Sequence, residues 1–332
     1  MLALLAPGQG AQTPGQLTPW LDLDGVDARL RWWSAAAGLD LVDAGCHADA
    51  ETIRDTAVAQ PLIVASGLLA AEALGLTGTD NSPGPPVGPN VIAAGHSVGE
   101  ITAATIAGAL DAETALVFVA ARGRAMARAS ALTPTGMTAV LGGDAEEVSA
   151  HLTALGLVPA NRNGAGQIVA AGSLEALAKL DADPPPGARL RKLSVAGAFH
   201  TPYMEPGRDS LRALAAGMRP RAARWPLVTN AEGAVSAGGR ELVDGLVNQV
   251  AAPVRWDLCL ATLRERGVTA ILEFPPAGTL TAIARRELRG IRTLAVKGPD
   301  DLAAARDLIV EHTAAAPEVS DQRNPTEAGA AL

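Results

Sequence analysis

The stretch Asn90-Val91-Ile92-Ala93-Ala94-Gly95-His96-Ser97-Val98-Gly99-Glu100 places a serine between two glycines, directly after a short apolar run. The apolar run predicts a buried strand, and the segment 101–110, rich in alanine and isoleucine, predicts a helix after the turn. A serine on a strand-to-helix turn is a nucleophile elbow, in which the helix N–H groups face a developing oxyanion. In a chain with 35 glycines the pattern alone also fits an ordinary turn. The flanking strand and helix favour the elbow.

Strands and helices alternate on both sides of this elbow. The segments 21–44 and 62–74 predict helices, the second with Pro61 in its first turn. Apolar runs predict further strands at 2–6, 227–230, 269–274 and 293–296. Such alternation is typical of a mostly parallel sheet with helices on both faces. The outer parts of the chain are therefore expected to form an α/β lobe.

The middle of the chain follows a different order. Its strand and helix patterns succeed one another as β-α-β-β-α-β, with the last strand at 189–195, and this order is that of a ferredoxin-like module. We therefore expect a small inserted lobe at 134–195 and a large lobe formed by residues 1–133 and 196–312. Alanine, proline and polar residues dominate 313–332, which predicts a disordered tail.

Composition narrows the class of protein. The chain has 332 residues, of which 48% are hydrophobic, and a net charge of −8, which argues against a nucleic-acid partner. No continuous apolar run is expected to cross a bilayer, and the N-terminus lacks the basic region of a signal peptide. Cys46 and Cys259 match neither a disulfide framework nor a metal site. The sequence predicts a cytoplasmic, metal-free protein without a membrane partner, with the monomer as the default state.

A serine nucleophile needs a base, and histidine suits neutral pH. The five histidines are His47, His96, His151, His200 and His312. By elimination His200 is the candidate base, because it lies on a glycine-bounded loop after a strand, where loops carry sites. A packed structural histidine is the other interpretation. No Asp or Glu stands in a recognisable motif between Ser97 and His200, a departure from the Ser…Asp…His order of α/β-hydrolases.

Several short motifs follow one another in an order that resembles the malonyl-CoA:acyl carrier protein transacylase family. They are Gly8-Gln9-Gly10-Ala11-Gln12, Gln60-Pro61, the elbow, Arg122-Gly123, Gly197-Ala198-Phe199-His200, Asn248-Gln249, Pro253-Val254-Arg255-Trp256 and Glu273-Phe274-Pro275-Pro276-Ala277-Gly278. The resemblance covers roughly residues 2 to 300. It implies a hydrolase-like α/β lobe with a ferredoxin-like insert, in agreement with the two lobes predicted above.

The resemblance also implies a reaction. Ser97 would attack the thioester of malonyl-CoA and hold the malonyl group as an ester, and His200 would move the proton. A carbonyl near Gln249 would orient the histidine in place of a carboxylate, and the backbone N–H groups of Gln9 and Val98 would form the oxyanion hole. The malonyl group would then pass to the phosphopantetheine thiol of an acyl carrier protein, in a ping-pong reaction without a permanently bound cofactor.

Three further residues would bind substrate if the resemblance holds. Arg122 would clamp the free malonyl carboxylate in a bidentate pair, which a planar guanidinium forms and lysine does not. The same buried arginine would reject acetyl groups, which leave its charge unpaired. Phe199 would crowd an added α-methyl group, and Gln60 would also contact the substrate.

Docking of an acidic carrier protein on this acidic chain requires a local basic patch. One candidate is Arg189, Arg191 and Lys192, where alternate strand residues share a face, and the other includes Arg285 and Arg286. Each cluster is equally well interpreted as a solvated charged surface.

Three alternative functions stay open. A serine thioesterase or esterase would release the acyl group to water, and a stand-alone polyketide synthase acyltransferase would serve another carrier. A non-catalytic carrier-binding module would need neither Ser97 nor His200.

Overall fold

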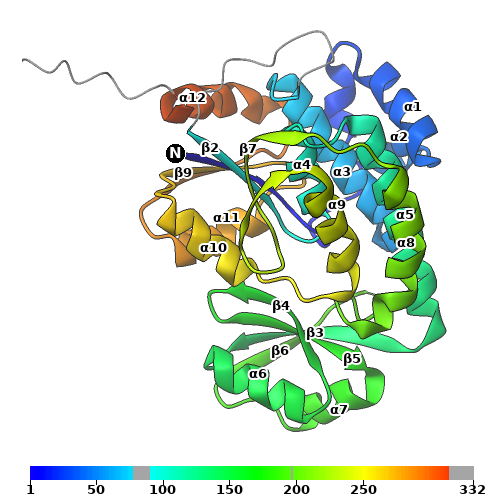
Figure 1. Cartoon of the computed structure of the whole chain (residues 1–332), viewed down its shortest axis with the longest axis vertical. Coiled ribbons are helices and arrows are strands. Elements are labelled where there is room, and N and C mark those ends of the chain that lie inside the picture. The colour runs from blue at the N-terminus through cyan, green and yellow to red at the C-terminus, as the bar shows by residue number, and fades with distance from the viewer. Residues whose placement is uncertain (78–89, 196, 314–332) are drawn as a thin grey trace, which may run out of the picture.

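The computed structural model describes residues 1–77, 90–195 and 197–313. The expected tail at 313–332 lies outside these ranges except for Thr313. The larger of the two sheets (Figure 1) has six strands in the order β10-β9-β1-β2-β7-β8. Its strands are β1 (Leu2–Ala6), β2 (Val91–Gly95), β7 (Ala222–Val228), β8 (Val235–Gly238), β9 (Ala270–Glu273) and β10 (Arg292–Ala295). All neighbours in it are parallel except β7 and β8.

Helices cover both faces of this sheet because its central strands are apolar along their whole length. In β1, Leu2 and Leu4 join one buried cluster, whereas Ala3 and Leu5 join another on the opposite face. The first cluster includes α1 (Val26–Ala37), α2 (Leu41–Cys46), α3 (Thr56–Ala73), α4 (Gly99–Ile106), α5 (Ala112–Leu132), α8 (Glu205–Gly217), α9 (Gly239–Asn248) and α12 (Leu302–Thr313). The second includes α10 (Trp256–Glu265) and α11 (Thr279–Glu287).

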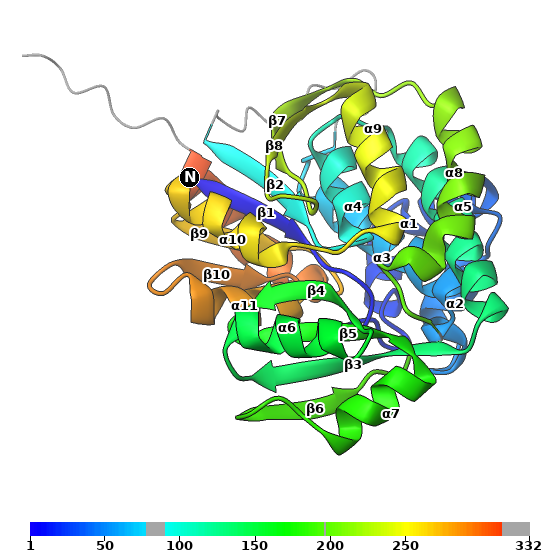
Figure 2. The same ribbon diagram turned by 60° about the horizontal axis from the view of Figure 1, so that its bottom comes forward.

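The inserted segment forms a separate antiparallel sheet in the order β4-β5-β3-β6. Its elements are β3 (Thr135–Gly142), α6 (Ala145–Ala154), β4 (Val158–Gly164), β5 (Gln167–Ser173), α7 (Leu174–Ala182) and β6 (Ala188–Lys192). This is the predicted ferredoxin-like order. Backbone hydrogen bonds from Val254 N to Ala160 O, 2.8 Å, and from Arg162 N to Val254 O, 2.9 Å, fasten β4 to the large lobe. Figure 2 shows β4 beside α10 of the large lobe.

Helix α3 departs from the sequence-based expectation in two ways. It begins at Thr56, where the Asp55 side chain caps the Ala57 N–H, so Pro61 lies in the helix interior and not in the first turn. It is also long and apolar enough, by length and composition, to span a membrane, although no such segment was expected. In the structure 78% of its apolar window is buried inside the protein, packed on α4 and α5. That burial is typical of a core helix.

Three other boundaries differ. The segment expected as one helix at 21–44 is divided into α1 and α2 by Gly38, which ends α1 in a left-handed conformation. The strand expected at 227–230 begins at Ala222 and pairs with β8, which the apolar pattern did not reveal because Val235–Gly238 is short and mostly polar or small. The last strand of the small lobe ends at Lys192 and does not reach Val195.

Candidate active site

The elbow is as tight as its glycines predicted. A Cβ at Gly95 would lie 2.0 Å from the Gly99 carbonyl, and one at Gly99 would lie 2.2 Å from the Ala6 carbonyl oxygen. Ser97 has a φ of +53°, a left-handed conformation that is strained for a residue with a side chain. In this conformation the Ser97 side chain projects from the turn between β2 and α4.

The Ser97 hydroxyl lies within hydrogen-bonding distance of His200. Ser97 Oγ lies 2.7 Å from His200 Nε2, and His200 Nδ1 lies 2.8 Å from the carbonyl oxygen of Gln249. Because a carbonyl only accepts, Nδ1 carries the ring proton, and Nε2 of the neutral ring is free to accept from the serine. Burial, and then the positive charge of Arg122, lower the pKa of His200 to about 3. The ring is therefore held in its neutral, basic form.

Arg122 on α5 is buried beside this pair and is held by two amides. One terminal nitrogen donates to Gln60 Oε1 at 2.6 Å, and the other donates to Gln249 Oε1 at 2.8 Å and reaches within 3.5 Å of Ser97 Oγ. Burial lowers the pKa of Arg122 to about 10, so the group is still a cation at neutral pH. Its direct side-chain partners are neutral, and its Nε has no partner among the described atoms. An incoming carboxylate is the natural complement to this cation.

Two buried residues to which the sequence analysis gave no role form hydrogen bonds with the elbow and with Gln249. Asn230, fully buried after β7, accepts from the Ser97 N–H at 2.7 Å and donates to Gly95 O at 2.7 Å. Glu100 on α4 accepts from Gln249 Nε2 at 2.6 Å and from Asn230 N at 3.3 Å. Burial raises the pKa of Glu100 to about 7. No spacing rule connects Asn230 to the serine, whereas Glu100 stands inside the elbow motif itself.

A cavity of about 330 Å³ opens between the two lobes at Ser97. From the large lobe its wall includes Gln9, Gln60, Ser97, Val98, Phe199 and His200, and from the small lobe Asn161, Asn163, Gln167 and Arg191. The structure thus brings together the residues predicted for the nucleophile, the base, the oxyanion hole and the substrate pocket. The amides of the small lobe add neutral hydrogen-bond donors and acceptors to this wall.

His96, set aside as a base by the sequence analysis, lines the same cavity and forms a contact between the two lobes. Its Nε2 lies 2.9 Å from Asn163 Oδ1, and its ring packs edge-on against Trp256 with centroids 5.6 Å apart. Gly8 lies against it, since a Cβ there would approach His96 Nδ1 to 2.9 Å. The glycine before Gln9 thereby lets this loop lie close to the elbow.

The predicted docking cations are only partly brought to this cavity. Arg191 lines it, whereas Lys192 pairs with Asp181 at 2.6 Å and Arg189 lies exposed on the same strand. Arg285 donates to the Thr293 hydroxyl at 2.9 Å, and Arg286 is exposed. Arg286 follows Ile283, a cavity residue, by one helical turn.

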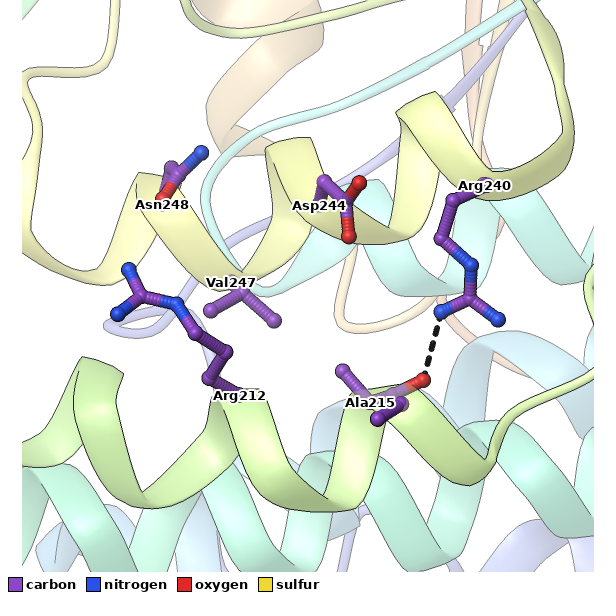
Figure 3. A pocket seen from close by; sticks show the side chains of 7 residues that line it. Arg212, Ala215, Arg240, Asp244, Val247 and Asn248 are labelled. Atoms are coloured by element: carbon purple, nitrogen blue, oxygen red, sulfur yellow. Dashed lines mark hydrogen bonds between the residues drawn. The ribbon is translucent and has the colours of Figure 1, made fainter.

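A second hollow lies between α8 and α9, and none of the predicted site residues lines it. Figure 3 shows Arg240 reaching from α9 to Ala215 on α8, with Arg212 and Asp244 nearby. Arg240 donates to Ala215 O and to Met218 O, each at 2.7 Å. Because α8 follows the His200 loop and α9 leads into Gln249, this contact fastens together the two elements that carry the base and its orienting carbonyl.

Across the three described ranges, no group of three or more His, Cys, Asp or Glu side chains is placed to hold a metal ion. Cys46 and Cys259 are both free thiols.

Comparisons with known proteins agree with this geometry. The acyl transferase domain family model matches residues 5–314. A malonyl CoA-acyl carrier protein transacylase of Mycobacterium tuberculosis (strain ATCC 25618 / H37Rv) is 55% identical over 306 residues, covering 91% of this chain and 98% of that protein. The crystal structure of MCAT from Mycobacterium tuberculosis superposes with a TM-score of 0.86 at 54% identity, covering 92% of this chain and 99% of that one. A type II polyketide synthase acyl-carrier protein in complex with its malonyl-transacylase gives a TM-score of 0.83 at 27% identity, covering 92% and 99%.

Proposed function

The chain belongs to the acyl transferase domain family, and from that membership we propose that it transfers malonyl groups from malonyl-CoA to an acyl carrier protein for fatty acid synthesis. The single observation that carries the proposal is the buried Arg122 cation, held by neutral amides within 3.5 Å of the Ser97 hydroxyl. A simple esterase has no need of a buried cation at this place. A substrate with a free carboxylate near its thioester does need one.

In the first half-reaction Ser97 Oγ attacks the thioester carbonyl while its proton passes to His200 Nε2, 2.7 Å away. The Gln249 carbonyl on Nδ1 stabilises the imidazolium that forms. The backbone N–H groups of Gln9 and Val98 stabilise the oxyanion, a type of contact worth about 3 to 4 kcal/mol per donor. The intermediate then collapses, the C–S bond breaks, and the coenzyme A sulfur leaves with the proton from His200.

In the second half-reaction the phosphopantetheine thiol of the carrier enters the same cavity. Neutral His200 takes the thiol proton, the sulfur attacks the malonyl ester, and Ser97 leaves with the proton returned by the imidazolium. Arg122 holds the malonyl carboxylate throughout, so both half-reactions share one acyl position. Phe199 in the cavity wall limits the space beside the malonyl α-carbon.

The proposal also includes the oligomeric state, the compartment and the docking surface of the enzyme. It acts as a monomer in the cytoplasm, without a permanently bound cofactor, because coenzyme A and phosphopantetheine arrive on the substrates. Arg191 at the cavity wall, together with Arg286, one helical turn beyond a cavity residue, forms the basic surface on which an acidic carrier docks.

Intact-protein mass spectrometry tests the proposal directly. Enzyme mixed with malonyl-CoA and no carrier should gain one malonyl group, Ser97→Ala should gain none, and holo carrier should remove the group from the wild type. An adduct that decays to free malonate as fast without carrier would establish a hydrolase. No adduct from any acyl-CoA would refute covalent catalysis by Ser97.

A further inference from the structure

Glu100 is a buried carboxylate that the reaction described above does not use. It is 3% exposed and does not line the acyl cavity. It lines instead a separate cavity of about 270 Å³ on the far side of Gln249. A buried carboxylate is costly unless it is hydrogen-bonded, and its partners here are Gln249 Nε2 and Asn230 N.

These contacts determine how the Gln249 amide is oriented. The amide NH₂ donates to Ser97 O and Asn230 Oδ1, each at 3.1 Å, and to the Glu100 carboxylate at 2.6 Å, its shortest contact and the one to a group that can carry a charge, which leaves Oε1 facing Arg122 at 2.8 Å. The reversed amide would set its NH₂ against the Arg122 N–H groups and its oxygen against the Glu100 carboxylate. Both contacts would then be repulsive.

The arrangement also separates two charges by one neutral group. Arg122 and Glu100 lie at opposite ends of the same Gln249 amide, and each stabilises the ionised form of the other. A carboxylate bound directly to Arg122 would compete with the carboxylate of the substrate. With the neutral amide between them, Glu100 stabilises the Arg122 cation from a distance and leaves the guanidinium able to pair with substrate.

From this geometry we propose that Glu100 is a positioning residue for malonyl selection, which acts through the Gln249 amide to hold Arg122 open toward the substrate carboxylate. The inference rests on the proposed function, because it takes Arg122 as the malonyl clamp. It assigns Glu100 no contact with substrate. The acyl group that needs Arg122 is therefore affected, and an acyl group without a carboxylate is not.

The decisive variant is Glu100→Gln, which keeps the size of the side chain and replaces the charged acceptor of the Gln249 NH₂ by a neutral amide. Its kcat/KM for loading of Ser97 from malonyl-CoA should fall about 10- to 100-fold, the scale of one lost hydrogen bond to a charged group. Slow loading from acetyl-CoA, followed by intact mass, should not change. Thr102→Val is the matched control, since it alters a buried polar side chain on the same helix outside this network. Equal losses with both acyl groups, or no loss with malonyl-CoA, would overturn the proposal.

Two further variants keep the test valid if Glu100→Gln folds poorly. In Gln249→Ala, which retains the backbone carbonyl on His200, adding Glu100→Gln should cost no further malonyl loading. Glu100→Asp, which keeps the charge, should lie closer to the wild type than Glu100→Gln. Additive losses, or an aspartate worse than the amide, would each contradict the proposal. Failure of the proposed function is distinguishable, because Arg122→Ala would then leave malonyl loading intact.

Discussion

The two walls of the acyl cavity differ in how they carry charge. On the large-lobe side the titratable groups are buried, since Arg122, His200 and Glu100 are 1%, 3% and 3% exposed; of these three, His200 lines the cavity and the other two lie behind it. The small lobe contributes neutral amides at Asn161 and Asn163 and cations such as Arg191 that face solvent. Buried charges interact strongly and only in one geometry, whereas exposed charges are screened. Under the proposed function, the large lobe supplies the chemistry and the acyl selection, and the small lobe supplies screened contacts with the carrier.

The largest effect is expected from variants of the dyad, the hydrogen-bonded pair Ser97 and His200 in the large lobe. Ser97→Ala and His200→Ala should each lower kcat/KM for malonyl transfer by about 10⁴- to 10⁶-fold, since members of such a unit act together. The double variant should be little worse than either single variant, as steady-state transfer assays would show. Losses that multiply in the double variant would show that His200 does not act through Ser97.

The next largest effect should come from Arg122. Arg122→Ala should lower kcat/KM for malonyl loading about 10²- to 10³-fold, the scale of truncating one partner of a buried charge pair. Acetyl loading should not fall. Arg122→Lys should recover little, because a single ammonium cannot replace the fork that binds Gln60, Gln249 and substrate. Recovery to the wild-type rate in the lysine variant would mean that charge alone selects malonate.

The turn at Ser97 could be predicted from the sequence because the constraints on it are local. Gly95 and Gly99 are required by contacts of 2.0 and 2.2 Å with nearby backbone, and such local constraints leave a visible motif. The β-α-β-β-α-β order of the small lobe is visible for the same reason. The roles of Ser97, His200 and Arg122 came from the family resemblance, and they stay predictions until variants are measured.

What the sequence did not predict depends on contacts between distant segments. Asn230 holds the Ser97 N–H across 133 residues of sequence separation, and nothing around it marks it as a partner of the elbow. Glu100 lies inside the motif, yet its function depends on Gln249, 149 residues away. A single exposed-looking carboxylate after a glycine gives no sign of burial. Local pattern predicts elements, whereas only the packed fold brings these polar groups together.

The pH dependence of loading should separate the acyl-selecting network from the dyad. The pKa of His200 is lowered to about 3, so the neutral base persists as pH falls from 8 to 5, and acetyl loading should stay nearly flat. The pKa of Glu100 is raised to about 7, so the carboxylate gains its proton as pH falls through neutrality. Malonyl kcat/KM should therefore fall below pH 7, by up to about tenfold per unit of pH.

Other groups near Glu100 do not account for such an inflection. The titratable groups near it are Arg122, Cys259 and, across the far cavity, Glu232 and Glu241. The pKa of Arg122 stays near 10, and burial raises that of Cys259. Glu100→Gln should abolish the fall in malonyl kcat/KM. Persistence of the same inflection in that variant would assign it elsewhere.

On the small lobe, the effects should be smaller and dependent on salt. Arg191→Ala should raise KM for the carrier about three- to tenfold at low ionic strength, with wild type and variant converging at 0.5 M salt, since exposed charges act mainly on encounter. Arg285→Ala is the matched control, because Arg285 is already engaged by Thr293. A salt-independent change in kcat would instead place Arg191 in contact with the reacting arm.

The smallest effect should arise behind the large-lobe wall, where α9 is fastened to α8. Arg240→Ala removes two hydrogen bonds to carbonyls at the end of α8 and should lower the free energy of unfolding by about 1 to 2 kcal/mol, measured by urea denaturation. Arg212→Ala, from the same hollow (Figure 3), should change it by less than about 0.5 kcal/mol. Malonyl kcat/KM of Arg240→Ala should stay within about twofold of the wild type, because the His200–Gln249 contact has its own buried surroundings. A fall in malonyl kcat/KM well beyond twofold would mean that the spacing of α8 and α9 sets the position of His200. The geometry of the Ser97–His200 pair would then depend on the Arg240 contact between these two helices.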